Sequence, residues 1–205
     1  MNIESYLMRI DMDRWDVAQT TEFSHHQDLS REAYSYASEC IAKYLEIDYK
    51  TDFKDKVIVE VGAGPRGSIL LTEGNFKRGI IIEPLIDRWP AEIRQDYEAI
   101  GVEIIAAPYE DLEIDEQVDE TWFFNVVQHV LDPQEQLELA MKTSKVVRVF
   151  ESIGSATDEA HPHFITKETF TDVLGDFGKI YKGGSNPGFH GSDCYHGTWY
   201  ASDNV

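Results

Sequence analysis

Residues Lys56–Leu70 read KVIVEVGAGPRGSIL, an apolar run followed by a glycine-rich turn. All residues of 57–61 except the fourth are β-branched, which is the composition of a central parallel strand buried on both faces. The glycines that follow have the spacing G-x-G-x-x-G, typical of a turn that lets a nucleotide ligand approach the backbone. We therefore predict a strand, a ligand-binding turn and then a short helix over Ser68–Glu73.

Two carboxylates accompany this turn. Glu60 stands two residues before the first glycine, where it would oppose the charge of a pyrophosphate and attract an ammonium group. Glu83 ends a second apolar run about twenty residues after the turn, where a carboxylate can accept hydrogen bonds from both hydroxyls of a ribose. The N-terminus of the short helix is expected to face an anionic group of the ligand, such as a carboxylate.

The pattern Glu60–Gly64 followed by Glu83 resembles motifs I and II of the class I S-adenosylmethionine-dependent methyltransferases. Asn125–Pro133 (NVVQHVLDP) and His161–Leu174 (HPHFITKETFTDVL) are similar to the segments after the fourth and fifth strands in members that act on small molecules. The resemblance implies a three-layer, Rossmann-like α/β fold with a seven-stranded mixed sheet and an antiparallel C-terminal strand. It also implies S-adenosylmethionine as methyl donor and S-adenosylhomocysteine as product.

The resemblance implies that residues of the turn and of the strand ends bind the methyl donor. The predicted donor residues are Glu60, Gly62, Ala63, Gly64, Glu83, Pro84, Pro108, Tyr109, Glu110, Asn125 and Val126. Pro108 stands where the family usually has an acid that binds the adenine amino group. We expect Glu110 or a neighbour to take that role, and Tyr109 to stack on or line the adenine.

Two histidines are candidates for accepting a proton from the methyl acceptor. His129 follows Asn125 by four residues, and an imidazole titrates close to neutral pH. The alternative is that His129 only orients its neighbours. His163 is expected in the acceptor pocket by resemblance. The segment RWDVAQTTEFSHH adds Trp15, Gln19 and His25 as expected acceptor contacts beneath a lid, with simple packing on the domain as the alternative.

Composition limits the class of protein. A chain of 205 residues predicts one domain, 1–205, with a helical cap over 1–50 and a core over 56–205. The net charge of −20 disfavours nucleic acid, and the tetrapeptide FFNV after the fourth strand differs from the N-P-P-Y-like motif of amino-methylating members that act on DNA and protein. We therefore expect a small-molecule acceptor. No feature of the sequence bears on oligomeric state.

The sequence also predicts a cytoplasmic protein with free thiols and no membrane partner. It contains two cysteines, no apolar run of membrane-spanning length and no signal-peptide layout at its start. We expect no metal site, because the histidines and cysteine near the C-terminus are loosely spaced: His161, His163, His190, Cys194 and His196. Two alternatives to a methyltransferase are a noncatalytic S-adenosylmethionine-binding module and an NAD-dependent oxidoreductase.

Overall fold

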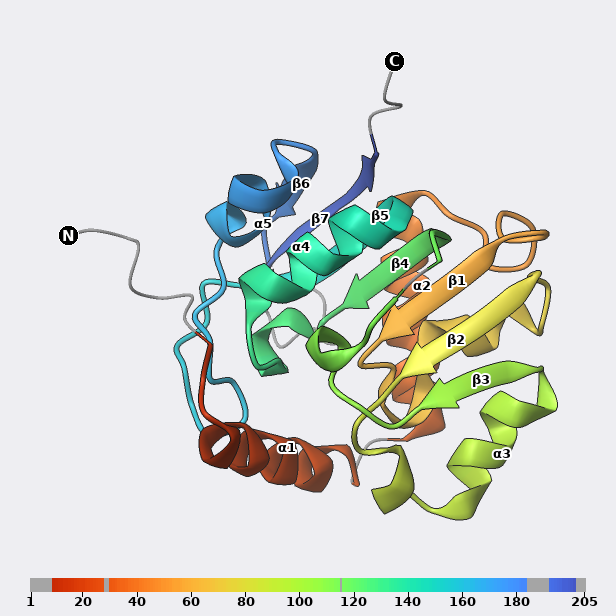
Figure 1. The fold of residues 1–205 in the computed structure, drawn as a ribbon, viewed down its shortest axis with the longest axis horizontal. Coiled ribbons are helices and arrows are strands. Elements are labelled where there is room, and N and C mark those ends of the chain that lie inside the picture. Colours follow the sequence, from red (N-terminus) through yellow and green to blue (C-terminus); the bar gives the residue numbers. More distant parts are fainter. Residues whose placement is uncertain (1–8, 28–29, 115, 184–191, 202–205) are drawn as a thin grey trace.

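The computed structural model describes residues 9–27, 30–114, 116–183 and 192–201. In this part of the chain one seven-stranded sheet has the order β3-β2-β1-β4-β5-β7-β6 (Figure 1). The strands are β1 (Val57–Val61), β2 (Arg78–Ile82), β3 (Val102–Ile105), β4 (Val118–Phe124), β5 (Ser144–Ile153), β6 (Gly178–Tyr181) and β7 (Asp193–Tyr200). β1 to β5 are parallel, whereas β7 runs antiparallel to both β5 and β6. The predicted mixed sheet with an antiparallel C-terminal strand is confirmed.

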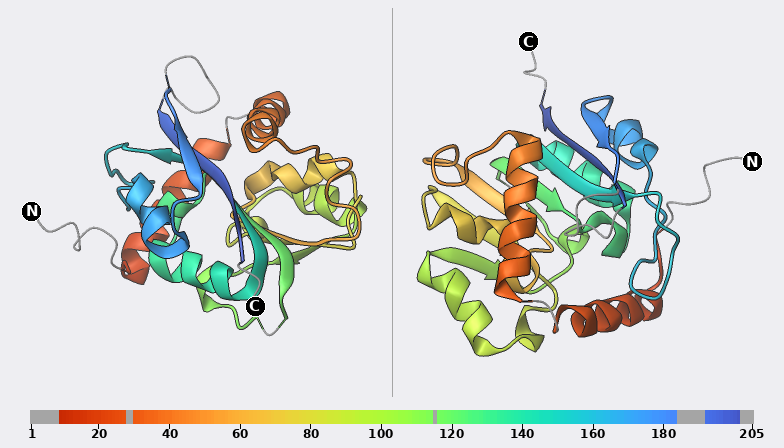
Figure 2. Two further views of the ribbon diagram at one scale, coloured as in Figure 1. Left: turned by 90° about the horizontal axis from the view of Figure 1, so that it is seen from above. Right: turned by 180° about the vertical axis from the view of Figure 1, so that it is seen from behind.

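Helices cover both faces of the sheet (Figure 2). On one face, α4 (Pro133–Thr143) and α5 (Lys167–Leu174) bury their apolar side chains against Val59 and Val61 of β1. On the other face, α2 (Arg31–Leu45) and α3 (Ala91–Ala99) pack beside the aromatic residues of β4 and β5. Because successive side chains of a strand point to opposite faces, β1 supplies Val59 and Val61 to one layer and Ile58 to the other.

Side chains cap the starts of α2 and α4. The Ser30 hydroxyl accepts a hydrogen bond from the amide of Ala33 at 3.3 Å and caps α2. Asp132 accepts from two amides in the first turn of α4, and Pro133 is the first helical residue. Such caps satisfy amides that have no partner inside the helix.

The segment after the glycine turn differs from the prediction. It forms two short 3-10 helices, Gly64–Arg66 and Ser68–Thr72, in place of one helix over Ser68–Glu73. Glu73 has a positive φ of 53°, which ends the second of them. The chain therefore leaves the turn as two short 3-10 helices instead of one short helix.

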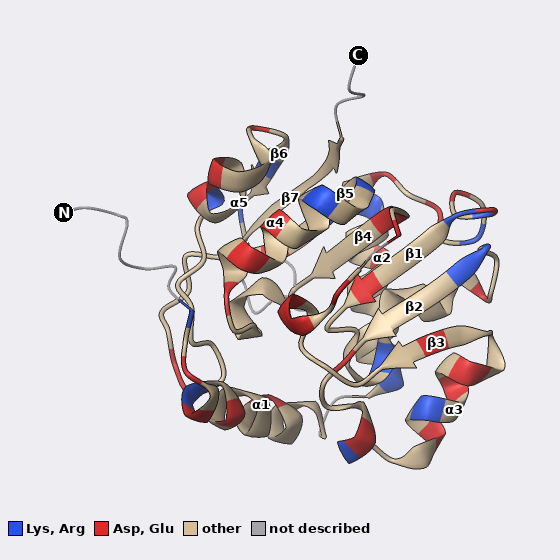
Figure 3. Cartoon of the chain, in the orientation of Figure 1, with Lys and Arg blue, Asp and Glu red and all other residues tan. Residues whose placement is uncertain are grey.

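Charge is spread over the molecule without a basic face in the view of Figure 3, where acidic residues mark most helices and basic residues are scattered among them. None of the helices in the described part of the chain has the length and apolar character needed to cross a bilayer.

Candidate functional site

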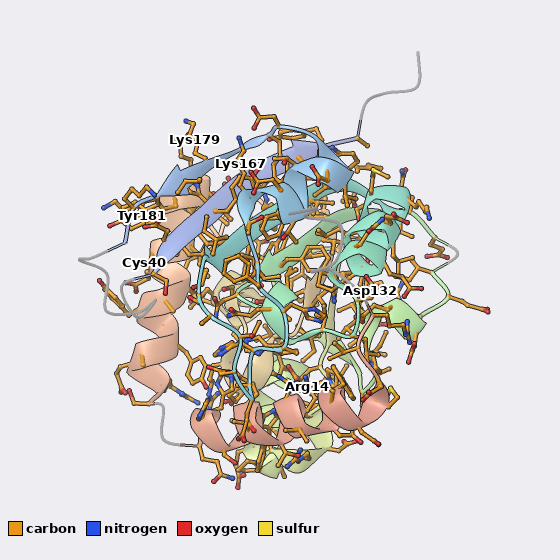
Figure 4. The ribbon with its side chains drawn as sticks, turned by 90° about the vertical axis from the view of Figure 1, so that its left-hand side faces the viewer. Arg14, Cys40, Asp132, Lys167, Lys179 and Tyr181 are labelled. Carbon is orange, nitrogen blue, oxygen red and sulfur yellow. The ribbon has the colours of Figure 1, made fainter. Side chains whose placement is uncertain are left out.

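The first helix, α1 (Met12–His26), lies across the end of the sheet toward which the arrowheads of β1, β2 and β4 point (Figure 1). Arg14, labelled in Figure 4, lies on the side of α1 turned toward the loop between β5 and α5. Its guanidinium donates to the carbonyl oxygens of Glu159 at 2.8 Å and Asp158 at 2.5 Å. Gln19 donates to the carbonyl oxygen of His129 at 3.0 Å. These bonds hold α1 over the carboxyl ends of the strands.

Between α1 and the sheet lies a cavity of about 530 Å³. All of the predicted donor residues line it: Glu60, Gly62, Ala63, Gly64, Glu83, Pro84, Pro108, Tyr109, Glu110, Asn125 and Val126. The predicted acceptor contacts Trp15, Gln19, His25 and His129 line it as well. A volume of this size is in the range of small-molecule and cofactor sites.

The glycine turn is shaped by two positive φ angles, +61° at Gly62 and +60° at Gly64. The Gly62 amide donates to the carbonyl oxygen of Ile82 at 2.8 Å, which ties the turn to β2. A Cβ atom added to Gly62 would lie 2.1 Å from Cγ2 of Val126, the first residue after Asn125 on the neighbouring loop. The turn thus needs glycine at 62 both for its backbone conformation and for its closeness to the loop after β4.

The two glycines separate these requirements experimentally. Gly64→Ala adds a Cβ whose nearest neighbour is His26 Cε1 at 3.9 Å, which is an ordinary van der Waals distance. The substitution therefore costs only the strain of a left-handed backbone, about 1–2 kcal/mol. Gly62→Ala adds the collision with Val126 and is expected to lower the free energy of unfolding by about 2–4 kcal/mol. Urea unfolding of both variants measures the difference. Equal losses would show that the Val126 contact does not restrict the turn.

Glu83 follows β2 and points into the cavity beside the turn. One carboxylate oxygen accepts from the amide of Gly64 at 2.7 Å and the other from the amide of Leu85 at 2.8 Å. Burial raises its pKa, and the two amides oppose that shift. Each carboxylate oxygen accepts more than one hydrogen bond, so both remain able to receive ribose hydroxyls.

Glu60 lines the cavity and is also hydrogen-bonded within the turn. Its two oxygens accept from the amides of Ser68 at 2.8 Å and Ile69 at 2.7 Å, at the start of the second 3-10 helix. The helix start that was expected to face a ligand carboxylate is therefore already paired with Glu60. Burial raises the Glu60 pKa to about 7. Sequence spacing could not show this, because the contact forms only when the turn folds back on β1.

The segment 108–110 lines the cavity, but its side chains are largely used within the protein. The Tyr109 ring is 1% exposed and packs edge-on against Phe123, with ring centroids 5.9 Å apart, so it presents no open face for stacking. Glu110 accepts from the amides of Leu131 at 2.9 Å and Asp132 at 3.1 Å, where the chain enters α4. The expectation of a stacking Tyr109 is not supported by this packing.

The loop after β4 is held by a carboxylate that the sequence analysis did not single out. Glu151 on β5 is fully buried, and one of its oxygens accepts from the amides of Val126 at 2.7 Å and Val127 at 3.0 Å. Its other oxygen has no partner among the described residues. Burial raises the Glu151 pKa to about 8, so the group is largely protonated at pH 7.

The buried Glu151 makes stability depend on pH in a definite direction. Because its folded-state pKa of about 8 exceeds the ordinary value of 4.5, the folded state holds a proton that the unfolded state has lost between these pH values. The free energy of unfolding should therefore fall as pH rises through this window, by up to about 1.4 kcal/mol per pH unit from this group. Glu151→Gln keeps an acceptor for both amides and removes the titration.

We expect the Glu151→Gln variant to unfold at a higher urea concentration than the wild type at pH 8.5, and at a similar one at pH 5. Glu92→Gln, an exposed position on α3, is the matched control and should leave the pH profile unchanged. A Glu151→Gln profile that follows the wild type would contradict a protonated Glu151 in the folded protein.

At the acceptor end of the cavity, titratable side chains of α1 lie next to His129 of the loop after β4. Glu22 of α1 accepts from Nε2 of His26 at 2.5 Å and lies 3.7 Å from Nδ1 of His129. Burial would raise the Glu22 pKa, but His129 and His26 outweigh it and lower the pKa to about 2. Burial lowers the pKa of His129 despite the nearby Glu22 charge.

His163 does not line the cavity, which corrects its predicted role in catalysis and acceptor binding. The side chain is 4% exposed, and Nε2 lies 2.8 Å from the carbonyl oxygen of Val130. His161, two residues earlier, lines the cavity instead, with ring centroid 4.8 Å from that of His129. The sequence pattern H-P-H alone could not say which histidine faces the site.

The histidines and cysteine considered as loosely spaced metal ligands do not converge in the described chain. His163 contacts a backbone carbonyl, and Cys194 is buried. His196, on β7, packs with its ring tilted against that of Tyr44 on α2. His190 lies outside the described residues. Other lining residues were not predicted at all, among them Tyr34, Trp89, Gln128, Asp158 and His161. They come from separate loops and helices, so no local motif marks them.

Neither a protein-family model nor a curated protein sequence matches the chain. Solved structures do match. Phosphoethanolamine N-methyltransferase 1 of Haemonchus contortus, in complex with phosphoethanolamine and S-adenosylhomocysteine, superposes with a TM-score of 0.66 at 13% identity, over 96% of this chain and 51% of that one. The chain thus spans about half the length of that protein.

Two further structures match over most of their length. The 1,6-didemethyltoxoflavin-N1-methyltransferase of Burkholderia thailandensis, with 1,6-didemethyltoxoflavin and S-adenosylhomocysteine bound, has a TM-score of 0.60 at 15% identity, covering 99% of both chains. The N-methyltransferase NodS of Bradyrhizobium japonicum, in complex with S-adenosylhomocysteine, has a TM-score of 0.57 at 13% identity, over 84% of this chain and 87% of that one.

The chain has the fold of the class I methyltransferases. In this methyltransferase fold the strand order reverses between β1 and β4, and open α/β sheets bind their ligands at such a reversal, beyond the carboxyl ends of the strands. The cavity described above lies at that place.

Proposed function

We propose that the chain is an S-adenosylmethionine-dependent methyltransferase that transfers a methyl group to a small-molecule acceptor. The observation that carries this proposal is the shared cavity, which joins the predicted donor residues at the ends of β1, β2 and β4 to the residues of α1 predicted for the acceptor. Donor and acceptor would therefore meet within one enclosed site, as methyl transfer requires.

The Glu60 contacts favour a sulfonium donor over a dinucleotide. A dinucleotide site places pyrophosphate at the amides of the helix that follows the glycine turn. Here the amides of Ser68 and Ile69 are occupied by Glu60. Of the described lining residues Arg66 alone carries a permanent positive charge, against the carboxyl groups of Glu22, Glu60, Glu83, Glu110 and Asp158. Such a cavity suits a cation better than a pyrophosphate.

The donor brings its own leaving-group activation, so the chain has only to bind, orient and exclude water. Glu83 would hold the ribose at the edge of the cavity beside the turn. His129 would accept the proton of an acceptor that is protonated at neutral pH. Its Nδ1 lies 3.0 Å from the carbonyl oxygen of Ala160, which only accepts, so the lone pair is on Nε2.

The matching structures guide the choice of acceptor. The three described above are all named as N-methyltransferases, and two hold small-molecule acceptors. We therefore propose small amines as the first acceptors to test. We do not expect a nucleic-acid acceptor, because the chain has a net charge of −20.

The organisation of the chain belongs to the same proposal. α1 would serve as the cap of a single domain whose core is 56–205, whereas α2 packs on the face of the sheet. A reducing cytoplasmic location accords with two free cysteines, Cys40 and Cys194.

Calorimetric titration with S-adenosylmethionine, S-adenosylhomocysteine and NADH tests the proposal. We expect micromolar binding of the first two and none of NADH. Release of S-adenosylhomocysteine in the presence of an amine panel then tests turnover. Binding of NADH alone would support an oxidoreductase, and tight product binding without turnover on any acceptor would support a noncatalytic binding module.

A further inference from the structure

Glu22, His129 and His161 bring three potential metal ligands to the acceptor end of the cavity. One ligand atom from each residue lies within 4.8 Å of the other two. Glu22 belongs to α1, His129 to the loop after β4 and His161 to the loop between β5 and α5, and all three line the cavity. Only the folded chain joins them.

Hydrogen bonds orient both imidazole rings in the same way. The Nδ1 atom of His129 lies 3.0 Å from the carbonyl oxygen of Ala160, and that of His161 lies 2.9 Å from a carboxylate oxygen of Asp158. Both partners are acceptors, so each Nδ1 carries the hydrogen. Each ring is left with its lone pair on Nε2, the form in which a neutral imidazole binds a metal ion.

This arrangement has the outer contacts that metal sites in proteins use. A metal-bound histidine usually donates its other ring N–H to a carboxylate or a backbone carbonyl, and a metal-bound carboxylate is itself hydrogen-bonded. Glu22 meets that condition, because Oε1 accepts from Nε2 of His26 at 2.5 Å. The hydroxyl of Tyr34 in turn contacts Nδ1 of His26. Each of the three potential ligands therefore has a partner that fixes its orientation.

The spacing requires only a small closure. Ligand atoms bound to a tetrahedral zinc ion at 2.0–2.1 Å lie about 3.3 Å apart. The three atoms here lie within 4.8 Å of one another, so a bound ion would have to draw them together by about 1.5 Å or less. The ligand set is also suitable, because a metal ion binds unprotonated imidazoles and the Glu22 carboxylate adds a negative charge.

We propose that Glu22, His129 and His161 bind a first-row divalent transition-metal ion. Two imidazole nitrogens and one carboxylate oxygen are a ligand set of zinc and of non-haem iron sites, and they leave coordination positions open toward the cavity. The ion would also link α1 to the two loops that it covers. The proposal goes beyond methyl transfer and is tested without it.

The test uses the full chain, without an affinity tag and stripped of metal with a chelator. Co²⁺ titration followed by visible absorption, and Zn²⁺ titration by calorimetry, should each show one equivalent bound. Glu22→Gln and His161→Gln should weaken binding at least about 100-fold, and Asp158→Asn by about 10- to 100-fold. His196→Gln, a histidine on β7 outside the cavity, is the matched control and should bind as the wild type does.

Circular dichroism of each variant before titration establishes that the chain is folded. Absence of stoichiometric binding by the wild type would overturn the proposal. So would equal affinity of folded His161→Gln and wild type, or a loss of binding caused by His190→Gln instead, since the ion would then sit elsewhere.

Discussion

Replacing Glu83 with alanine is expected to weaken the binding of S-adenosylmethionine and S-adenosylhomocysteine by about 100- to 10,000-fold. Two charge-assisted hydrogen bonds to ribose hydroxyls contribute about 1.5–3 kcal/mol each, and each 1.4 kcal/mol changes a dissociation constant tenfold. The variant also removes the acceptor of the Gly64 and Leu85 amides, which shapes the turn itself. Calorimetric titration of both ligands measures the loss.

Two controls make this result specific. Glu92→Ala removes an exposed carboxylate of α3 and should leave donor affinity unchanged. Thermal unfolding of Glu83→Ala shows whether the chain is folded at the temperature of titration. A folded Glu83→Ala protein with wild-type affinity would remove the donor site from this end of β2.

Replacing His129 with alanine is expected to lower the turnover rate by about 100- to 10,000-fold while changing donor affinity less than about threefold. A positioned proton acceptor contributes a rate factor of this size, and the residue lies toward α1, away from the predicted ribose contact at Glu83. Steady-state release of S-adenosylhomocysteine measures turnover, and calorimetry measures donor affinity. Normal turnover of the folded variant would exclude His129 from the reaction.

His196→Ala is the matched control, because this half-buried histidine on β7 does not line the cavity, and it should retain turnover. A chelator arm separates two roles for His129. If chelation leaves wild-type turnover intact, His129 acts as the base. If chelation lowers turnover and added metal restores it, His129 acts as a metal ligand, because a ring whose Nε2 holds an ion has no lone pair left for a proton.

Local patterns in the sequence predicted part of the secondary structure. The β-branched run of β1 and the glycine spacing after it predicted the first strand and its turn, and the family resemblance implied the seven-stranded sheet with its antiparallel C-terminal strand. The first strand and its turn depend on neighbouring residues along the chain, whose propensities act over a few positions. The resemblance to the methyltransferase family then supplied the positions of the donor residues, which the parallel strands bring together at one edge of the sheet.

Side-chain partners were decided only by the tertiary structure. Glu60 accepts from two amides eight and nine residues away, because the turn folds back on β1. His163 points at a backbone carbonyl while His161 enters the cavity, and Glu22 meets both His129 and His161 across three elements. The Glu22 contacts join residues more than a hundred positions apart and depend on loop paths that no local spacing encodes. The sequence by itself determined the sheet and the end of it that is predicted to bind a ligand. Only the tertiary structure determined which titratable side chains lie next to one another at that end.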